Sequence, residues 1–226
     1  MSASALRGLY LIADTGWLEA GRLVAAVAAA LDGGGALVQY RNKAPLTPAR
    51  REELARLAAL CRARRVPLIV NDDVALAREI GAAGVHLGRD DTTVAMAKGA
   101  LGPRMIVGAS CYNRLDLAHA AARAGADYAA FGSFFPSPTK PDAVRADLDL
   151  LRRARAELDI PLAAIGGITA DNGKSLVAAG ADLLAVASGV FAAADPAAAA
   201  RPYARLFAST DSGTDLFVEN VLHSQG

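Results

Sequence analysis

Short apolar runs recur along the chain, and longer segments with helical spacing separate them. Each run is apolar at most positions instead of alternating, which is typical of strands that are covered on both faces. Several runs begin after an Ala-rich segment and a glycine, the residue that most readily adopts the positive φ found at helix C-termini. The runs are GLYLIAD (8–14), GGGALVQYR (33–41), PLIVNDD (67–73), AAGVHLG (82–88), MIVGAS (105–110), AGADYAAFG (124–132), PLAAIGG (161–167) and AGADLLAVASG (179–189).

The segments between these runs have the spacing of amphipathic helices, as in residues 47–65 and 114–124. Strand–helix units repeated eight times within about 200 residues predict a single (β/α)8 TIM barrel, an α/β fold, over residues 1–208. A doubly wound open sheet is the main alternative. Residues 209–226 start with a polar, linker-like stretch and contain DLFVENVL, which has the pattern of a short helix. We assign no role to this C-terminal tail.

Composition and charge narrow the range of functions. Hydrophobic residues make up 53% of the sequence, which is enough to bury a sizeable core, and the two cysteines form neither a disulfide framework nor a zinc motif. The charges of the 24 basic and 23 acidic residues nearly cancel, so the sequence lacks the excess of positive charge that is typical of nucleic-acid-binding proteins. The most apolar stretch, LVAAVAAALDGGGALV, is interrupted well short of a membrane span. We therefore expect a cytoplasmic protein with neither a nucleic-acid nor a membrane partner.

In a TIM barrel the residues that directly follow each strand gather at one rim, where the active site lies. Reading only these positions selects mostly polar and charged residues, although the strands themselves are apolar. We therefore expect a site at this rim, built from Asp14, residues 39–43, residues 71–73, residues 89–91, Ser110, residues 137–140, Gly166, Gly167 and residues 187–189.

Three cations around the mouth of the barrel suit this rim to phosphate. Arg offers a planar fork and Lys a point charge to phosphate oxygens, and neutral donors complete the remaining hydrogen bonds. A single exposed Arg or Lys is most simply explained as solvated surface, but three at strand ends favour a phosphate site. The cations are Arg41, Lys43 and Lys140, and the neutral donors are Asn71, Ser110, Ser137 and Thr139.

Two aspartates, Asp72 and Asp91, follow neighbouring strands and are candidates for a magnesium site. Mg²⁺ is usually bound by one or two carboxylates together with water and substrate phosphates. The competing explanation is helix capping, because an Asp that precedes a helix accepts N–H bonds from its first turn. We expect Asp73, and Asp90 or Thr92, to cap the helices, which leaves Asp72 and Asp91 for the metal.

The loops AIGGIT (164–169) and VASGVF (186–191) follow the last two predicted strands, where barrels commonly bind a phosphate group. Tight turns alone would also explain their glycines. The stretch GGITADNGKS resembles a P-loop, but its spacing is one residue too long and its GKS falls where a helix should already be running.

The sequence offers no clear acid–base pair for proton transfer. Cys111 would need a base within hydrogen-bonding reach to act as a nucleophile. His86 falls inside a predicted strand, His119 inside a predicted helix and His223 in the tail, so packing explains Cys111 better. The predicted rim would bind a metal-bound diphosphate on one side and a monophosphate on the other, and it offers no general base. This combination favours a reaction in which a phosphorylated acceptor displaces pyrophosphate.

Seven motifs, in order over about residues 8–208, resemble those of the thiamine-phosphate synthase family. The resemblance implies a (β/α)8 barrel that joins hydroxymethylpyrimidine diphosphate to hydroxyethylthiazole phosphate, giving thiamine phosphate and pyrophosphate, with Mg²⁺ as cofactor. It also implies a dissociative reaction, in which pyrophosphate leaves first and the thiazole nitrogen captures the pyrimidine carbocation. The motifs are VQYRNK, IVNDDVALA, GVHLGRDD, GASCYN, FGSFFPSPTKPDA, AIGGIT and AVASGVF.

Carried over by position, the resemblance divides the rim between the two small-molecule substrates. It makes Asp72 and Asp91 the magnesium ligands. It implies a pyrimidine diphosphate site formed by Gln39, Tyr40, Arg41, Asn42, Lys43, Asn71, Ser110 and Lys140, in which Arg41, Lys43, Ser110 and Lys140 are catalytic. The implied thiazole phosphate site is formed by Ser137, Pro138, Thr139, Gly167, Ala187 and Ser188.

Three positions differ from the family pattern, and other functions remain as alternatives. Many relatives have an acidic residue in place of Asn42, Gln in place of Arg89 and His in place of Tyr112. None of these differences removes an implied ligand. The alternatives are a thiazole tautomerase on the same barrel, a phosphate-binding barrel isomerase and a non-catalytic regulator that binds thiamine phosphate. The diphosphate and magnesium residues favour the synthase, and the sequence is compatible with a homo-oligomer.

Overall fold

The computed structural model of the chain describes residues 6–18, 21–89, 91–136 and 144–208. Within these ranges eight parallel strands form a closed barrel, in which each strand pairs with the next and the last pairs with the first. The predicted TIM barrel is confirmed, and the open-sheet alternative is wrong because hydrogen bonds join the first and last strands. The strands are β1 (Gly8–Asp14), β2 (Gly35–Arg41), β3 (Leu68–Asn71), β4 (Gly84–Leu87), β5 (Ile106–Tyr112), β6 (Tyr128–Gly132), β7 (Leu162–Ile165) and β8 (Leu183–Val186).

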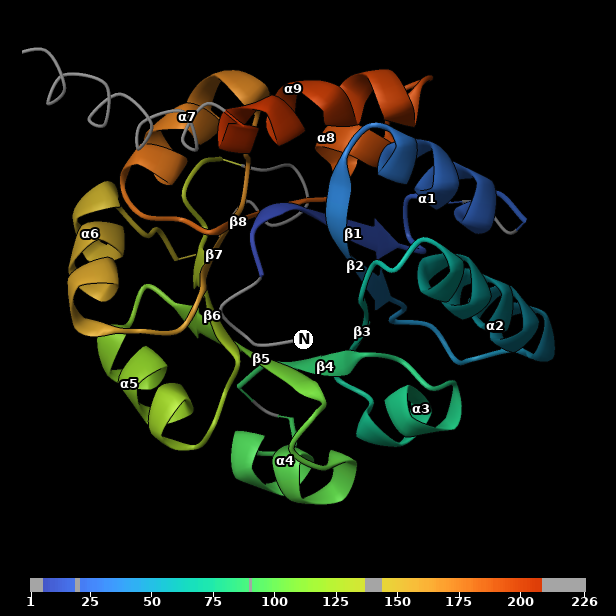
Figure 1. Cartoon of the computed structure of the whole chain (residues 1–226), viewed down its shortest axis with the longest axis horizontal. Helices are drawn as coiled ribbons and strands as arrows, with labels where there is room; N and C mark the ends of the chain where they lie inside the picture. The colour runs from blue at the N-terminus through green and yellow to red at the C-terminus, as the bar shows by residue number, and fades with distance from the viewer. Residues whose placement is uncertain (1–5, 19–20, 90, 137–143, 209–226) are drawn as a thin grey trace, which may run out of the picture.

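Helices surround the barrel on its outside (Figure 1). The ring ends with α9, which packs against both α1 and α7 and so closes the outer layer. The helices are α1 (Leu23–Asp32), α2 (Pro48–Ala63), α3 (Val74–Glu79), α4 (Val94–Leu101), α5 (Leu115–Arg123), α6 (Leu148–Glu157), α7 (Ala170–Ala178), α8 (Ser188–Phe191) and α9 (Pro196–Ala208). None of the helices in the described ranges is long and apolar enough to cross a membrane. The predicted tail, residues 209–226, lies outside the described residues.

Each strand buries both of its faces, which explains why the apolar runs do not alternate with polar residues. All seven residues of β1 are buried. Tyr10 and Ile12 point into the barrel interior, where they pack with residues of β2, β3, β6 and β8, whereas Leu9 and Leu11 pack against the outer helices. The two apolar layers therefore enclose each strand, as expected of a parallel barrel.

Candidate active site

The polar residues predicted for the rim lie at the ends of neighbouring strands. Asp14, Arg41 and Asn71 are the last residues of β1, β2 and β3, and the strand register places Asp14 directly beside Arg41. Because all strands are parallel, these ends face the same side of the barrel. The structure therefore brings together Asp14, Arg41 and Asn71, which the sequence analysis selected from separate loops.

Arg41 is held in place by Asp14. Its Nη1 donates to Asp14 Oδ2, and the other carboxylate oxygen accepts the backbone N–H of Gly16 at 2.9 Å. Asp14 is 8% exposed, so this ion pair is largely shielded from water. A single hydrogen bond leaves most of the guanidinium donors of Arg41 available to a ligand. The sequence analysis placed Asp14 at the rim without giving it a role, and its contact with Arg41 depends on the β1–β2 register.

Asn42 and Lys43 continue from the end of β2. Asn42 Oδ1 accepts a hydrogen bond from the hydroxyl of Thr15 at 2.7 Å, and Asn42 Nδ2 donates to the carbonyl oxygen of Ala44 at 2.7 Å. The Asn42 side chain thus ties the loop after β2 to the loop after β1. Lys43 forms an ion pair with Asp72 across the rim.

Asp72 and Asp91 form a pair of carboxyl groups within hydrogen-bonding reach of each other. Burial favours the neutral form of Asp72, but hydrogen bonds from Lys43 and Asp91 outweigh it, so the pKa of Asp72 lies below its usual value. Burial and the neighbouring Asp72 raise the pKa of Asp91, whose Oδ2 accepts the backbone N–H of Gly88 at 2.6 Å. Within the described ranges no group of three or more His, Cys, Asp or Glu residues gathers as a metal cluster.

The backbone around Asp72 keeps its side chain at the rim. Asp72 has a φ of 65°, a region that non-glycine residues rarely adopt, and its N–H donates to the carbonyl oxygen of His86 on β4 at 2.8 Å. The next residue, Asp73, caps α3 by accepting the backbone N–H of Leu76 at 2.8 Å. The predicted capping role of Asp73 is therefore confirmed.

The expected cap of α4 is wrong. The N-cap is Thr93, whose hydroxyl oxygen accepts the backbone N–H of Met96 at 3.3 Å. Thr92 lies one residue too early, because the helix starts only at Val94, and Asp90 lies outside the described residues. A threonine with extended backbone directly before the first helical residue is a strong cap, and the adjacent pair of threonines concealed which one it would be.

Ser110, on β5, is the end of a chain of buried hydrogen bonds. Its Oγ lies 2.9 Å from His86 Nε2, and His86 Nδ1 lies 2.9 Å from the hydroxyl of Tyr128. The Tyr128 hydroxyl contacts that of Tyr10 at 2.8 Å, and Tyr10 in turn accepts a hydrogen bond from Gln39 Nε2 at 2.6 Å. Burial lowers the pKa of His86 to about 4, so its imidazole is neutral near pH 7. The sequence analysis treated His86 only as a strand residue, because no local pattern specifies the β4–β5 register that brings it to Ser110.

Two residues point away from the barrel interior. The Tyr40 side chain packs in the outer layer, and its buried hydroxyl has no partner among the described residues. A contact between Tyr40 and a ligand at the rim would therefore come from its backbone. Cys111 is also in the outer layer, and burial raises the pKa of its thiol to about 12, in agreement with a packing role.

The loop after β7 depends on its two glycines. Gly166 and Gly167 have φ values of 104° and 61°, which L side chains rarely adopt. A Cβ atom on Gly167 would lie only 2.7 Å from the carbonyl oxygen of Phe135, so glycine permits close contact with the loop after β6. Ala187 and Ser188 lie at the start of α8, directly after β8. The predicted residues Ser137, Pro138, Thr139 and Lys140 lie outside the described residues.

Two of the positions that differ from the family pattern touch each other. The guanidinium carbon of Arg89 lies 4.8 Å from the centre of the Tyr112 ring, a cation–π arrangement. Tyr112 follows an irregularity in the β5–β6 pairing and has a φ of 55°. Arg89 therefore packs against the end of β5.

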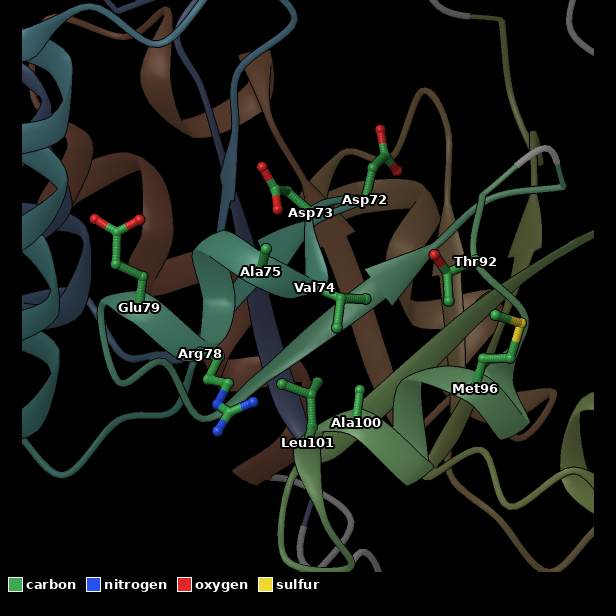
Figure 2. A pocket seen from close by; sticks show the side chains of 10 residues that line it. All are labelled: Asp72, Asp73, Val74, Ala75, Arg78, Glu79, Thr92, Met96, Ala100 and Leu101. Atoms are coloured by element: carbon green, nitrogen blue, oxygen red, sulfur yellow. The ribbon is translucent and has the colours of Figure 1, made fainter.

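A pocket of about 950 Å³ lies on the outside of the barrel, between α3 and α4 (Figure 2). Asp72 and Asp73 stand at one end of it, and Ala100 and Leu101 lie at the other end. Among the rim residues that the structure describes, only Asp72 and Asp73 line this pocket, so it borders this part of the rim without forming it.

Comparison with known proteins identifies relatives along most of the chain. Residues 9–190 match the family model described as thiamine monophosphate synthase. The thiamine-phosphate synthase of Azoarcus sp. is 55% identical over 203 residues, covering 90% of this chain and 98% of the relative. That of Thiobacillus denitrificans is 58% identical over 188 residues, covering 83% of this chain and 89% of the relative.

A solved structure agrees with these sequence relatives. The thiamine phosphate pyrophosphorylase of Pyrococcus furiosus superposes with a TM-score of 0.79 at 33% identity, covering 92% of this chain and 98% of that one. A 3-hexulose-6-phosphate synthase superposes with a TM-score of 0.66, but at 19% identity it shares only the fold.

Proposed function

This chain belongs to the thiamine monophosphate synthase family, and from that premise we propose which of its rim residues carry out the reaction. The enzyme joins hydroxymethylpyrimidine diphosphate to hydroxyethylthiazole phosphate and releases pyrophosphate, giving thiamine phosphate. The observation that carries the assignment of residues is the set of Lys43, Asp72 and Asp91, one ammonium and two carboxyl groups held together beside Arg41.

Arg41, Lys43, Asn71 and Ser110 bind the diphosphate of the pyrimidine substrate. Arg41 is anchored by Asp14 through one nitrogen, which leaves a planar set of N–H donors for phosphate oxygens. Lys43 is 59% exposed and so is free to exchange Asp72 for a phosphate oxygen. Gln39 and the backbone around Tyr40 and Asn42 complete this side of the site. Lys140, which lies outside the described residues, is assigned here by the resemblance alone.

Asp72 and Asp91 would hold a magnesium ion beside the diphosphate. Two carboxyl groups this close at the rim, one with a lowered and one with a raised pKa, fit a divalent cation, because the cation would neutralise the repulsion between the two charges. The positive φ of Asp72 fits the same role, since such backbone conformations persist mainly where function requires them. When bound, magnesium would neutralise charge on the diphosphate and make it a better leaving group.

Gly167, Ala187 and Ser188 bind the phosphate of the thiazole substrate. The loops after the last two strands and the start of a short extra helix form a phosphate site in many TIM barrels, and α8 occupies that place here. Ser137, Pro138 and Thr139 belong to the same site by resemblance. The contact of Gly167 with Phe135 supports this grouping, because it brings the loop after β7 against the segment that leads into residues 137–140.

The reaction needs no proton transfer by the protein. The bond from the pyrimidine methylene carbon to the diphosphate oxygen breaks first, and its electron pair leaves with pyrophosphate. The lone pair of the thiazole nitrogen then forms the new carbon–nitrogen bond to the pyrimidine carbocation. The role of Arg41, Lys43 and Ser110 is to stabilise the charge that develops on the leaving group, and the rim as a whole aligns the two rings. A buried, neutral His86 and an outward-facing Cys111 are compatible with such a mechanism.

The experiment that tests the proposal mixes the protein with both substrates and magnesium and follows thiamine phosphate through its fluorescent oxidation product. Product that disappears on addition of a chelator, and returns with excess magnesium, is the expected result. Folded protein that yields no product would favour the thiazole tautomerase or the non-catalytic regulator. Product formation that is unaffected by the chelator would contradict the role of Asp72 and Asp91. A cytoplasmic location and self-association stay predictions.

A further inference from the structure

A continuous chain of hydrogen bonds crosses the barrel interior below the rim and joins two residues of the proposed pyrimidine diphosphate site. It runs from Gln39 on β2 through Tyr10, Tyr128 and His86 to Ser110 on β5. We propose that Tyr10, Tyr128 and His86 are positioning residues, which fix the Gln39 amide and direct the Ser110 hydroxyl proton outward to the substrate. The inference about the substrate rests on the proposed function. The direction in which the hydrogen bonds run from Gln39 to Ser110 does not depend on it.

The direction follows from counting hydrogens. Gln39 Nε2 donates to the Tyr10 hydroxyl, so the one hydroxyl hydrogen of Tyr10 is left to donate to Tyr128. Tyr128 then donates its own hydrogen to His86 Nδ1. A neutral imidazole that accepts at Nδ1 carries its proton on Nε2, which donates to the Ser110 oxygen. Ser110 has thus accepted a hydrogen bond, and its own hydrogen is free to point to the rim.

With a neutral imidazole, only one other direction satisfies every member of this hydrogen-bond chain. If the Gln39 amide were turned over, its oxygen would accept from Tyr10, Tyr10 would accept from Tyr128, and His86 would carry its proton on Nδ1. Ser110 would then donate inward to His86 and face the rim with lone pairs alone. Such a hydroxyl would repel an anionic leaving group instead of stabilising it. The tautomer of His86 therefore reports the direction of the whole chain.

The barrel is built around these hydroxyl groups. Tyr10 and Tyr128 are almost fully buried, and burial raises the pKa of both, so both keep their protons over the physiological range. The rings of Tyr10 and Tyr128 meet edge to face at 5.9 Å, and the His86 ring stacks on Tyr128 at 5.5 Å. At Gly108, two residues before Ser110, a Cβ atom would overlap the Tyr128 ring and its hydroxyl. The missing side chain at Gly108 thus makes the space that Tyr128 needs to reach His86.

The chain orients groups at both of its ends. With one N–H of its amide committed to Tyr10, Gln39 keeps its oxygen as an acceptor and its second N–H as a donor. Such a pair matches the adjacent ring nitrogen and amino group of an aminopyrimidine, as Gln does with adenine. At the other end, Ser110 supplies one directed donor to the diphosphate. The same chain therefore fixes the polarity of both contacts before the substrate arrives.

The first test measures the His86 tautomer in the protein by ¹⁵N NMR of histidine-labelled enzyme, since protonated and unprotonated ring nitrogens have distinct shifts. A His86→Gln variant assigns the resonances by their loss. The expected result is a proton on Nε2 and none on Nδ1 at pH 7. A proton on Nδ1 would overturn the proposed direction. This measurement needs no turnover, so it stands whether or not the protein makes thiamine phosphate.

The second test asks whether Tyr128 acts through Ser110. Tyr128→Phe removes only the hydroxyl, and we expect kcat to fall about tenfold to a hundredfold, the range seen when the partner of a functional side chain is removed. In a Ser110→Ala background, the same substitution should have little further effect, because the group that it positions is gone. Cys61→Ala removes a buried thiol of α2 in the outer layer, away from the rim, and serves as the control with unchanged kcat.

Two results would contradict a positioning role. One is a Tyr128→Phe variant with wild-type kcat; the other is a Tyr128→Phe effect that is as large in the Ser110→Ala background as in the wild type. If Tyr128→Phe does not fold, Tyr10→Phe interrupts the chain one step earlier and is subject to the same two criteria. Wild-type protein without any synthase activity would refute the proposed function while leaving the tautomer result to decide the direction of the chain.

Discussion

The Asp72→Asn substitution separates the role of this side chain in the reaction from its role in the fold. Asn is similar in size to Asp and tolerates a φ of 65° equally well, because both residues adopt the left-handed region more readily than other side chains. The backbone bond from Asp72 to His86 does not involve the side chain. The substitution removes the ion pair with Lys43, which is 59% exposed, and exposed pairs contribute at most about 1 kcal/mol. For a chain of this size, the expected decrease in Tm is no more than about 4 °C.

Turnover should respond much more strongly than Tm. The amide removes one of the two charges that hold magnesium and the diphosphate, and the loss of one preorganised electrostatic contact typically lowers the rate about a hundredfold or more. We therefore expect kcat/KM to fall by at least this factor and the magnesium concentration needed for half-maximal rate to rise. Thiamine phosphate formation over a magnesium titration, together with thermal unfolding of the same preparation, measures both effects.

The neighbouring residue provides the matched control. Asp73 caps α3 through its contact with the backbone N–H of Leu76, and Asn caps helices about as well as Asp. Asp73→Asn should therefore leave Tm and turnover close to wild type, although it changes the same functional group one residue away. Wild-type turnover and magnesium dependence in Asp72→Asn would refute the assignment, as would an equal loss in both variants.

Three further predictions concern the interior and the anchor of the rim. Burial lowers the pKa of His86 from 6.5 to about 4, so the unfolded chain binds a proton below about pH 6.5 that the folded chain does not. Stability is then lost as the pH falls from about 6.5 to 4, by about 2 kcal/mol at pH 5, and His86→Gln should flatten this part of the urea-unfolding profile. Gly108→Ala forces a methyl group into the Tyr128 ring and should lower the free energy of unfolding by about 1–3 kcal/mol, whereas an unchanged urea midpoint would show that the space is not needed. Asp14→Asn releases Arg41 and should raise KM for the pyrimidine diphosphate about tenfold with KM for the thiazole phosphate unchanged, and equal changes in both constants would contradict the division of the rim.

Much of the fold and of the rim was predictable because both follow from local rules. The apolar runs and the glycines before them located all eight strands of the described barrel. The main difference is β5, which continues two residues past the end of its predicted run, to Tyr112. Strand ends in a parallel barrel must share one rim, so Arg41, Asn71 and Asp72 could be grouped before their distances were known.

The remaining features depend on which way side chains point and how strands are staggered. Tyr40 is adjacent to Gln39 in sequence, yet the two residues face opposite sides of β2, one toward the helices and one into the barrel. His86 and Ser110 meet because β4 and β5 pair in one register, which no local pattern specifies. The cap of α4 was misplaced for a related reason, since choosing between adjacent threonines requires the backbone angles.

A crystal structure of the enzyme with magnesium, pyrophosphate and thiamine phosphate tests the central assignment most directly. The assignment predicts pyrophosphate against Arg41, Lys43 and Ser110, with magnesium between Asp72 and Asp91. It predicts the phosphate of thiamine phosphate at the loops after β7 and β8. Pyrophosphate bound away from these residues, such as in the pocket between α3 and α4, or magnesium without contact to either aspartate, would contradict it.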